Sequence, residues 1–163
     1  MSRAWKLGAD VDTDQLVPGA TMKFGLEVIA RHVLEAVRPD FAGGVRRGDV
    51  IVAGPNFGIG SSREQAASAL VQLGVAAVIA PSYGGLYFRN AFNVGLLLLT
   101  CAQAESIDDG EAIAFDARAG TVTRASGERL RCTPIPGFLL DMVEAGGLLA
   151  QLKSGPPTRT ERP

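Results

Sequence analysis

The sequence predicts an α/β domain organised around a mixed β-sheet. In the first two-thirds of the chain, short β-branched or leucine-rich runs alternate with segments of helical periodicity, which favours parallel strands joined by right-handed crossovers. In the last third, short strand-like pieces are separated by glycine-containing turns, which are typical of antiparallel hairpins. At 163 residues, the chain has the length of one domain with a substantial core.

The elements of the first two-thirds follow one another in a regular order. Residues 5–17 mix apolar pieces with acidic turn residues and end at Pro18-Gly19. Apolar residues at helical spacing predict a helix over 26–37, and a second helix that follows a glycine-rich turn and ends at Gly74. Buried strands are predicted over 48–54, 75–80 and 96–100, with a short helix over 86–94 between the last two.

The last third changes character. Residues 112–132 contain three short strand-like pieces, and residues 137–152 predict a closing helix that is interrupted at Gly146-Gly147. The segment 154–163 is polar and rich in proline, so it is predicted to be a disordered tail. The expected domain therefore spans residues 1–153.

Composition excludes several classes of protein. The net charge is −1, from 16 basic and 17 acidic residues without a Lys/Arg run, which argues against binding to nucleic acid or to an anionic membrane. The apolar run at 94–101 is too short to span a bilayer, and the N-terminus lacks the apolar core of a signal peptide. Cys101, Cys132 and His32 are too few for a self-contained metal or iron–sulfur site, and we expect a reducing, cytoplasmic setting.

The most informative stretch is NFGIGSSREQA, which begins at Asn56 and follows a predicted buried strand. Ser61-x-x-Glu64 has the spacing of a capping box, and that interpretation needs no ligand. The alternative is a site for a small carboxylate. Gly58 and Gly60 permit close approach, while Ser61, Ser62 and Arg63 offer hydroxyls and a guanidinium at the carboxyl end of a sheet. Neither a dinucleotide fingerprint nor a Walker loop is present.

Several segments in register resemble the small, swivel-domain subunits of the aconitase superfamily, in particular those of 3-isopropylmalate dehydratase and homoaconitase. These segments are ADVDTDQLVPG, RRGDVIVAGPNFGIGSSREQA, APSYGGLYFRNAFNVGL and AGGLLAQLK, and they extend from about residue 5 to residue 153. The resemblance implies a three-layer β/β/α swivel domain with a mixed sheet and with its helices on one side. It implies a hydro-lyase that isomerises a hydroxy dicarboxylate by dehydration and rehydration, most simply 3-isopropylmalate dehydratase in leucine biosynthesis.

The resemblance also implies roles for individual residues. Ser61 corresponds to the base that moves the substrate proton, and Ser62 and Arg63 correspond to groups that bind the substrate carboxylates. Asp14 corresponds to a site aspartate, and Lys23 lies in a loop that helps to select the substrate. A 4Fe-4S cluster is implied on a separate large subunit, with which this chain would form a heterodimer or heterotetramer.

Departures from the family pattern leave the substrate open. Ile59, Gly85 and the pair Ala20-Thr21 replace residues that are common in relatives. Homoaconitase and a methylmalate or citramalate hydratase therefore remain alternatives to 3-isopropylmalate dehydratase. From another class, a non-catalytic carboxylate-binding module is also an alternative. Arg89 and Asn90 either stabilise their helix or shape the site.

Overall fold

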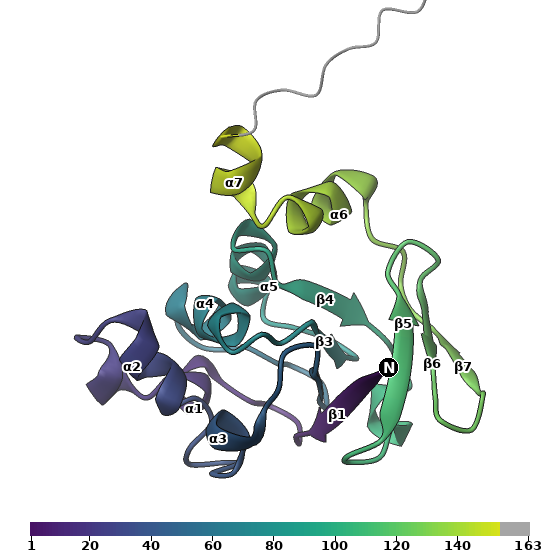
Figure 1. Cartoon of the computed structure of the whole chain (residues 1–163), viewed down its shortest axis with the longest axis horizontal. Helices are drawn as coiled ribbons and strands as arrows, with labels where there is room; N and C mark the ends of the chain where they lie inside the picture. Colours follow the sequence, from purple (N-terminus) through teal and green to yellow (C-terminus); the bar gives the residue numbers. More distant parts are fainter. Residues whose placement is uncertain (154–163) are drawn as a thin grey trace, which may run out of the picture.

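The chain folds around one seven-stranded sheet with the strand order β4-β3-β2-β1-β5-β6-β7 (Figure 1). The structure is a computed structural model that describes residues 1–153, so the predicted tail at 154–163 lies outside the described residues. In this described part, no helix has both the length and the apolar character needed to cross a membrane.

The sheet is mixed, as predicted. Its first four strands are parallel to one another, β5 pairs antiparallel with β1, and β5, β6 and β7 form an antiparallel meander. The strands are β1 (Ser2–Lys6), β2 (Val50–Val52), β3 (Ala77–Ala80), β4 (Leu97–Thr100), β5 (Ala112–Asp116), β6 (Thr121–Thr123) and β7 (Arg129–Arg131). β1 was not predicted, although it joins the parallel strands to the antiparallel ones.

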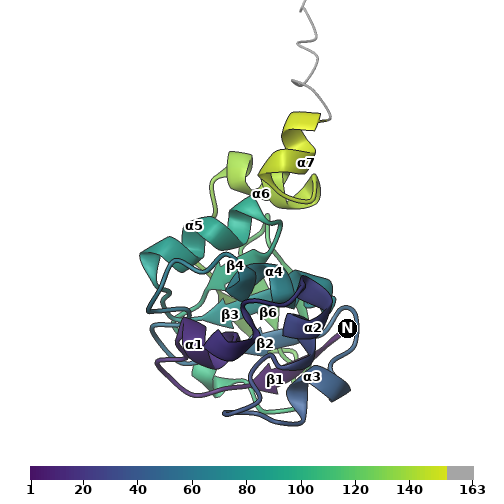
Figure 2. The same cartoon turned by 90° about the vertical axis from the view of Figure 1, so that its left-hand side faces the viewer.

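The helices cover one face of the parallel strands, and β5–β7 lie on the other side (Figures 1 and 2). This layering agrees with the three-layer arrangement that the resemblance implied. The helices are α1 (Thr13–Leu16), α2 (Leu26–Arg31), α3 (Phe41–Gly44), α4 (Gln65–Gln72), α5 (Gly85–Asn93), α6 (Gly137–Glu144) and α7 (Leu148–Lys153), and short 3-10 turns occupy Gly19–Thr21 and Ala104–Ser106. The break at Gly146-Gly147 was predicted correctly.

The helix predicted over 26–37 is shorter than expected, because α2 ends at Arg31. Leu34 takes a left-handed backbone conformation with φ 58°, and its N–H donates to the carbonyl of Leu16 at 3.2 Å. The fully buried Leu34 side chain then joins the core without continuing the helix. A tertiary contact thus overrides a correct local periodicity.

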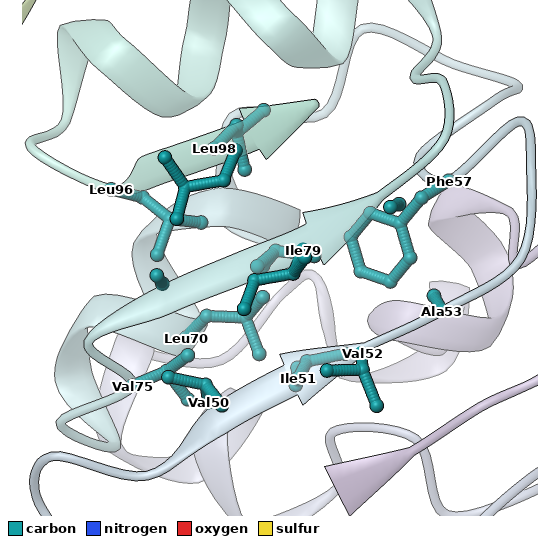
Figure 3. Close-up of a cluster of buried hydrophobic side chains, with 14 of the residues drawn as sticks. Val50, Ile51, Val52, Ala53, Phe57, Leu70, Val75, Ile79, Leu96 and Leu98 are labelled. Carbon is teal, nitrogen blue, oxygen red and sulfur yellow. The ribbon is translucent and has the colours of Figure 1, made fainter. Parts of the chain in front are cut away.

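The core is built on the parallel strands, and β2 and β3 are buried along their whole length. Because a parallel sheet with both faces covered has no solvent-facing side, its strands are continuous apolar runs. Figure 3 shows side chains of β2, Ile79 of β3 and Leu98 of β4 packing together with Leu70 of α4 and with Phe57 beyond the end of β2. The segment 56–64, which we call the serine turn, therefore starts from a rigid, buried base.

Candidate active site at the carboxyl ends of the parallel strands

The serine turn leaves β2 and immediately makes a close approach to α5. Gly58 has φ +78°, and a Cβ atom added there would lie 2.2 Å from Cγ of the buried Tyr87 ring. Gly60 has φ +109°, and a Cβ atom there would lie 3.0 Å from the Thr13 hydroxyl. The positive φ strains any larger residue at both positions, and at Gly58 the added Cβ atom would also collide with the Tyr87 ring.

The predicted capping box at Ser61-x-x-Glu64 is wrong. Helix α4 begins at Gln65, its N-cap residue is Glu64, and no side chain caps it. The N–H of Ser61 instead donates to the side-chain hydroxyl of Thr13 at 3.0 Å. Ser61 therefore precedes α4 by a full turn, and the helix dipole contributes less at its hydroxyl than the sequence suggested.

The N-terminal acidic block forms the short helix α1, and this helix has a complete capping box. The Asp12 carboxylate accepts the N–H of Gln15 at 2.8 Å, and the Gln15 side chain accepts the N–H of Asp12 at 3.1 Å. Asp12 is therefore the N-cap residue of α1. The cap fixes the orientation of Thr13 and Asp14, the first two residues of the helix.

Hydrogen bonds join this block to the serine turn. The N–H of Gly58 donates to the carbonyl of Val11 at 2.7 Å, and the N–H of Thr13 donates to the carbonyl of Ile59 at 2.9 Å. These bonds extend the parallel pairing of β1 with β2 beyond the strand ends. They bring the hydroxyls of Thr13 and Ser61 to 3.1 Å from each other. Thr13 is buried, whereas Ser61 is exposed.

Arg63 and Asp14 form an ion pair across the same junction. The guanidinium also donates to the carbonyl of Val17 at 3.3 Å, and its side chain is only 26% exposed. Asp14 is 69% exposed, so one edge of the pair faces solvent. On the other side of the turn, the side-chain amide of Asn90 on α5 donates to the carbonyl of Ser62 at 3.1 Å.

The structure brings together Asp14, Ser61, Ser62 and Arg63, whereas the Lys23 side chain lies against its neighbour Phe24. The Lys23 ammonium lies 5.3 Å from the centre of the exposed Phe24 ring. The same loop begins at Gly19, where an added Cβ atom would lie 3.8 Å from the Arg63 guanidinium. The loop thus borders the site at its start. Sequence reasoning missed Thr13, although it stands between Asp12 and Asp14 in the block that carried the resemblance.

The described residues do not provide a ligand set for a metal cluster. Within residues 1–153, no group of three or more His, Cys, Asp or Glu side chains is placed to hold a metal ion. Cys101 and Cys132 are both buried free cysteines. Iron–sulfur clusters are usually held by four cysteine thiolates, so these two thiols do not fit an iron–sulfur group.

The arrangement suits binding of an anion and transfer of a proton. A buried hydroxyl contacts an exposed one, and a half-buried guanidinium beside them can bind a carboxylate through two parallel hydrogen bonds. Because Ser61, Ser62 and Asp14 all face solvent, the site is open on one side. An open site of this kind needs a second surface to exclude water from a substrate.

Comparisons with known proteins agree with one another. Residues 41–104 match the family model described as the aconitase C-terminal domain. Small subunit 1 of 3-isopropylmalate dehydratase from Archaeoglobus fulgidus is 45% identical, covering 94% of this chain and 97% of that protein. The methanogen homoaconitase small subunit of Methanothermobacter thermautotrophicus is 44% identical, covering 90% of this chain and 86% of that protein. A crystal structure of 3-isopropylmalate dehydratase from Methanocaldococcus jannaschii matches with a TM-score of 0.88 and 37% identity, covering 94% of this chain and 92% of that chain.

Proposed function

This chain belongs to the family of 3-isopropylmalate dehydratase small subunits, and from that membership we propose that it is the small subunit of a hydro-lyase that interconverts 2-isopropylmalate and 3-isopropylmalate in leucine biosynthesis. Identity of 45% over nearly the full length of a relative is the observation that carries this proposal. The reaction removes water from one carbon pair of the substrate and returns it with the hydroxyl on the neighbouring carbon.

Ser61 moves the substrate proton in this proposal, and Ser62 and Arg63 bind the substrate carboxylates. The Arg63 guanidinium is held by Asp14 and by the Val17 carbonyl, so its position is set before a substrate arrives. A carboxylate bound by a guanidinium withdraws charge from the adjacent carbon, and the proton on that carbon becomes easier to remove. Serine is a weak base, so its alkoxide form depends on neighbouring hydrogen-bond donors.

The large subunit is the proposed partner, in a heterodimer or heterotetramer. We propose that it carries the 4Fe-4S cluster implied for the family, because the described residues of this chain lack a suitable ligand set. The small-subunit names of the relatives support a two-subunit enzyme. A partner surface over Ser61 would also exclude the water that now reaches the site. We place the enzyme in the cytoplasm, where its two free cysteines would stay reduced.

Lys23 is the proposed determinant of substrate choice. It lies in the exposed loop that starts beside Arg63, and its ammonium could reach a polar substituent of a bound dicarboxylate. The relative named as a methanogen homoaconitase small subunit is almost as similar as the isopropylmalate relatives, which keeps homoaconitate as the second candidate substrate. Turnover of both substrates by the same complex, compared by kcat/KM, decides between them.

The test is to mix the chain with its large subunit, reconstitute iron and sulfide, and follow the conversion of 3-isopropylmalate. Ser61→Ala should lower kcat by about 10²–10⁴-fold, the usual contribution of a positioned acid–base group. Ser126→Ala, in the β6–β7 turn, is the matched control and should leave kcat unchanged. Turnover of Ser61→Ala within a few-fold of the wild type would exclude Ser61 as the base. Tight dicarboxylate binding by the isolated chain, without turnover in the complex, would instead indicate a binding module.

A further inference from the structure

We propose that Thr13 is a positioning residue for Ser61, and that its hydroxyl holds Ser61 in place and donates a hydrogen bond to the Ser61 oxygen when that oxygen has lost its proton. The inference deepens the proposed function, because it rests on Ser61 as the group that moves the substrate proton. It starts from a juxtaposition of two residues that are far apart in the sequence. Their oxygens lie 3.1 Å apart, one buried and one exposed.

The hydrogen bonds around Thr13 restrict what its hydroxyl can do. Its oxygen accepts the Ser61 N–H at 3.0 Å, which occupies one of its lone pairs. Its proton and its second lone pair both remain available to the Ser61 hydroxyl at 3.1 Å. Because Thr13 is only 1% exposed, water cannot readily replace either contact. Among residues 1–153, no buried polar side-chain atom lacks a hydrogen-bond partner, which agrees with this assignment.

Thr13 is itself held rigidly. Its N–H donates to the Ile59 carbonyl at 2.9 Å, and its own carbonyl accepts the N–H of Val17 at 3.0 Å within the capped helix α1. Gly60 packs so closely that an added Cβ atom would lie 3.0 Å from the Thr13 oxygen. Because Gly60 has no side chain, the Thr13 and Ser61 hydroxyls have the space to lie within hydrogen-bonding distance of each other. A preorganised donor of this kind needs no rearrangement during the reaction.

The strength of the hydrogen bond between Thr13 and Ser61 depends on whether Ser61 is protonated. With Ser61 neutral, either hydroxyl can donate to the other. When Ser61 has given up its proton to water on the exposed side of the site, only Thr13 of the two can donate, and a hydrogen bond to a charged oxygen is about twice as strong as one between neutral groups. Thr13 keeps its own proton throughout, while Ser61 takes the substrate proton and gives it back. Thr13 therefore stabilises the reactive form of Ser61 without touching the substrate.

The kinetic test compares two substitutions in the reconstituted two-subunit enzyme, with 3-isopropylmalate as the substrate. Thr13→Val keeps the shape of the side chain but removes the hydroxyl, whereas Thr13→Ser keeps the hydroxyl. Thr13→Val should lower kcat by about 10²-fold with a small change in KM, since losing one such donor typically has that effect. It should also move the acidic limb of the kcat–pH profile to higher pH. Thr13→Ser should restore both to within a few-fold of the wild type.

A second measurement does not depend on the reaction. In the isolated full chain, hydrogen exchange at the Ser61 amide should be faster in Thr13→Val than in the wild type and unchanged in Thr13→Ser, because the amide donates to the Thr13 oxygen. Unchanged exchange in Thr13→Val would overturn the contact itself. If Ser61→Ala abolishes turnover while Thr13→Val leaves kcat and its pH profile unchanged, the inference fails and the proposed function stands. If Ser61→Ala is fully active, the proposed role of Ser61 is wrong, and the inference about Thr13 that rests on it is wrong as well.

Discussion

The two halves of the sheet are stabilised by different interactions, and only one of them carries the candidate site. In the parallel half, β2 and β3 are completely buried, and backbone pairing extends beyond the strand ends into the Asp12–Ile59 junction. In the antiparallel half, a buried residue alternates with partly buried ones in β6 and with exposed ones in β7, as expected for a sheet with one solvent face. All the residues we assign to proton transfer and carboxylate binding lie in the parallel half.

Charged side chains connect elements of the antiparallel half. Arg124 donates to both carboxylate oxygens of Glu111, at 2.8 and 3.2 Å, and this pair connects the end of β6 to the start of β5. Arg118 in the β5–β6 turn reaches Asp141 and Glu144 on α6. The Arg118 ion pairs are exposed and tolerate adjustment, whereas β2 and β3 of the parallel half are completely buried and held by close packing. The candidate site lies beyond the ends of these buried strands.

The largest expected effect comes from Gly58→Ala. The new methyl group would meet the buried Tyr87 ring at 2.2 Å, at a residue that also has φ +78°. Strain and overpacking together should lower the free energy of unfolding by roughly 3–5 kcal/mol and should abolish turnover of the complex. Urea denaturation of the isolated chain measures the first effect, and isomerase assays measure the second.

Gly127→Ala is the matched control in the antiparallel half. Gly127 also has a positive φ of +89°, but an added Cβ atom would have no neighbour within 4 Å. Only backbone strain remains, so we expect a loss of about 1 kcal/mol and unchanged turnover. Equal losses in the two variants would contradict the idea that the serine turn is fixed by its contact with Tyr87.

Glu111→Gln tests the ion pairs of the antiparallel half. Hydrogen bonding to the Arg124 guanidinium lowers the pKa of Glu111 to about 2, from an ordinary value of 4.5. The charged carboxylate therefore stabilises the fold above about pH 4.5, and this contribution is lost as the pH falls towards 2. Glu111→Gln should lower the free energy of unfolding by about 1 kcal/mol at pH 7 and less at pH 3, and it should leave turnover unchanged.

Denaturant titrations at the two pH values give this comparison directly. Asp141→Asn is the control, because Asp141 is 60% exposed and its pair with Arg118 should contribute little. A Glu111→Gln variant whose stability loss is as large at pH 3 as at pH 7 would contradict the electrostatic origin of the effect. A loss of turnover at pH 7 would show that the antiparallel half also positions the site.

Much of the fold could be predicted from the sequence, because apolar runs such as 75–80 and hairpin turns such as that near Gly127 are local signals. β1 was missed because its buried residues Ala4 and Trp5 lie beside charged residues, and because it is defined by distant partners, Val50 and Ala112 among them. The prediction of a capping box at Ser61 and Glu64 was wrong for a similar reason. The Ser61 N–H bonds to Thr13, and no local pattern records that contact. The resemblance named the residues of the site, but the contacts between them could be seen only in the folded structure.

The smallest effect is expected from Asn90→Ala, which removes one hydrogen bond at the rim of the site. The Asn90 side chain donates to the carbonyl of Ser62 and so attaches the exposed part of the turn to α5. A single neutral hydrogen bond contributes about 1 kcal/mol, so kcat/KM for 3-isopropylmalate should fall by roughly five-fold. Asn93→Ala, one turn further along the same helix, is the matched control, because Asn93 is exposed and lines a groove with Phe138 and Met142.

The distribution of the Asn90→Ala effect between kcat and KM is the informative result. If Asn90 only keeps Ser62 in place for carboxylate binding, KM should rise while kcat stays near the wild-type value. A fall in kcat with unchanged KM would instead mean that Ser61 moves with the turn, so that the contact with Thr13 is insufficient to hold it. Equal activity of Asn90→Ala and Asn93→Ala would show that the contact from α5 does not contribute to the site. The parallel half would then position the serines through the Thr13 and Gly58 contacts alone.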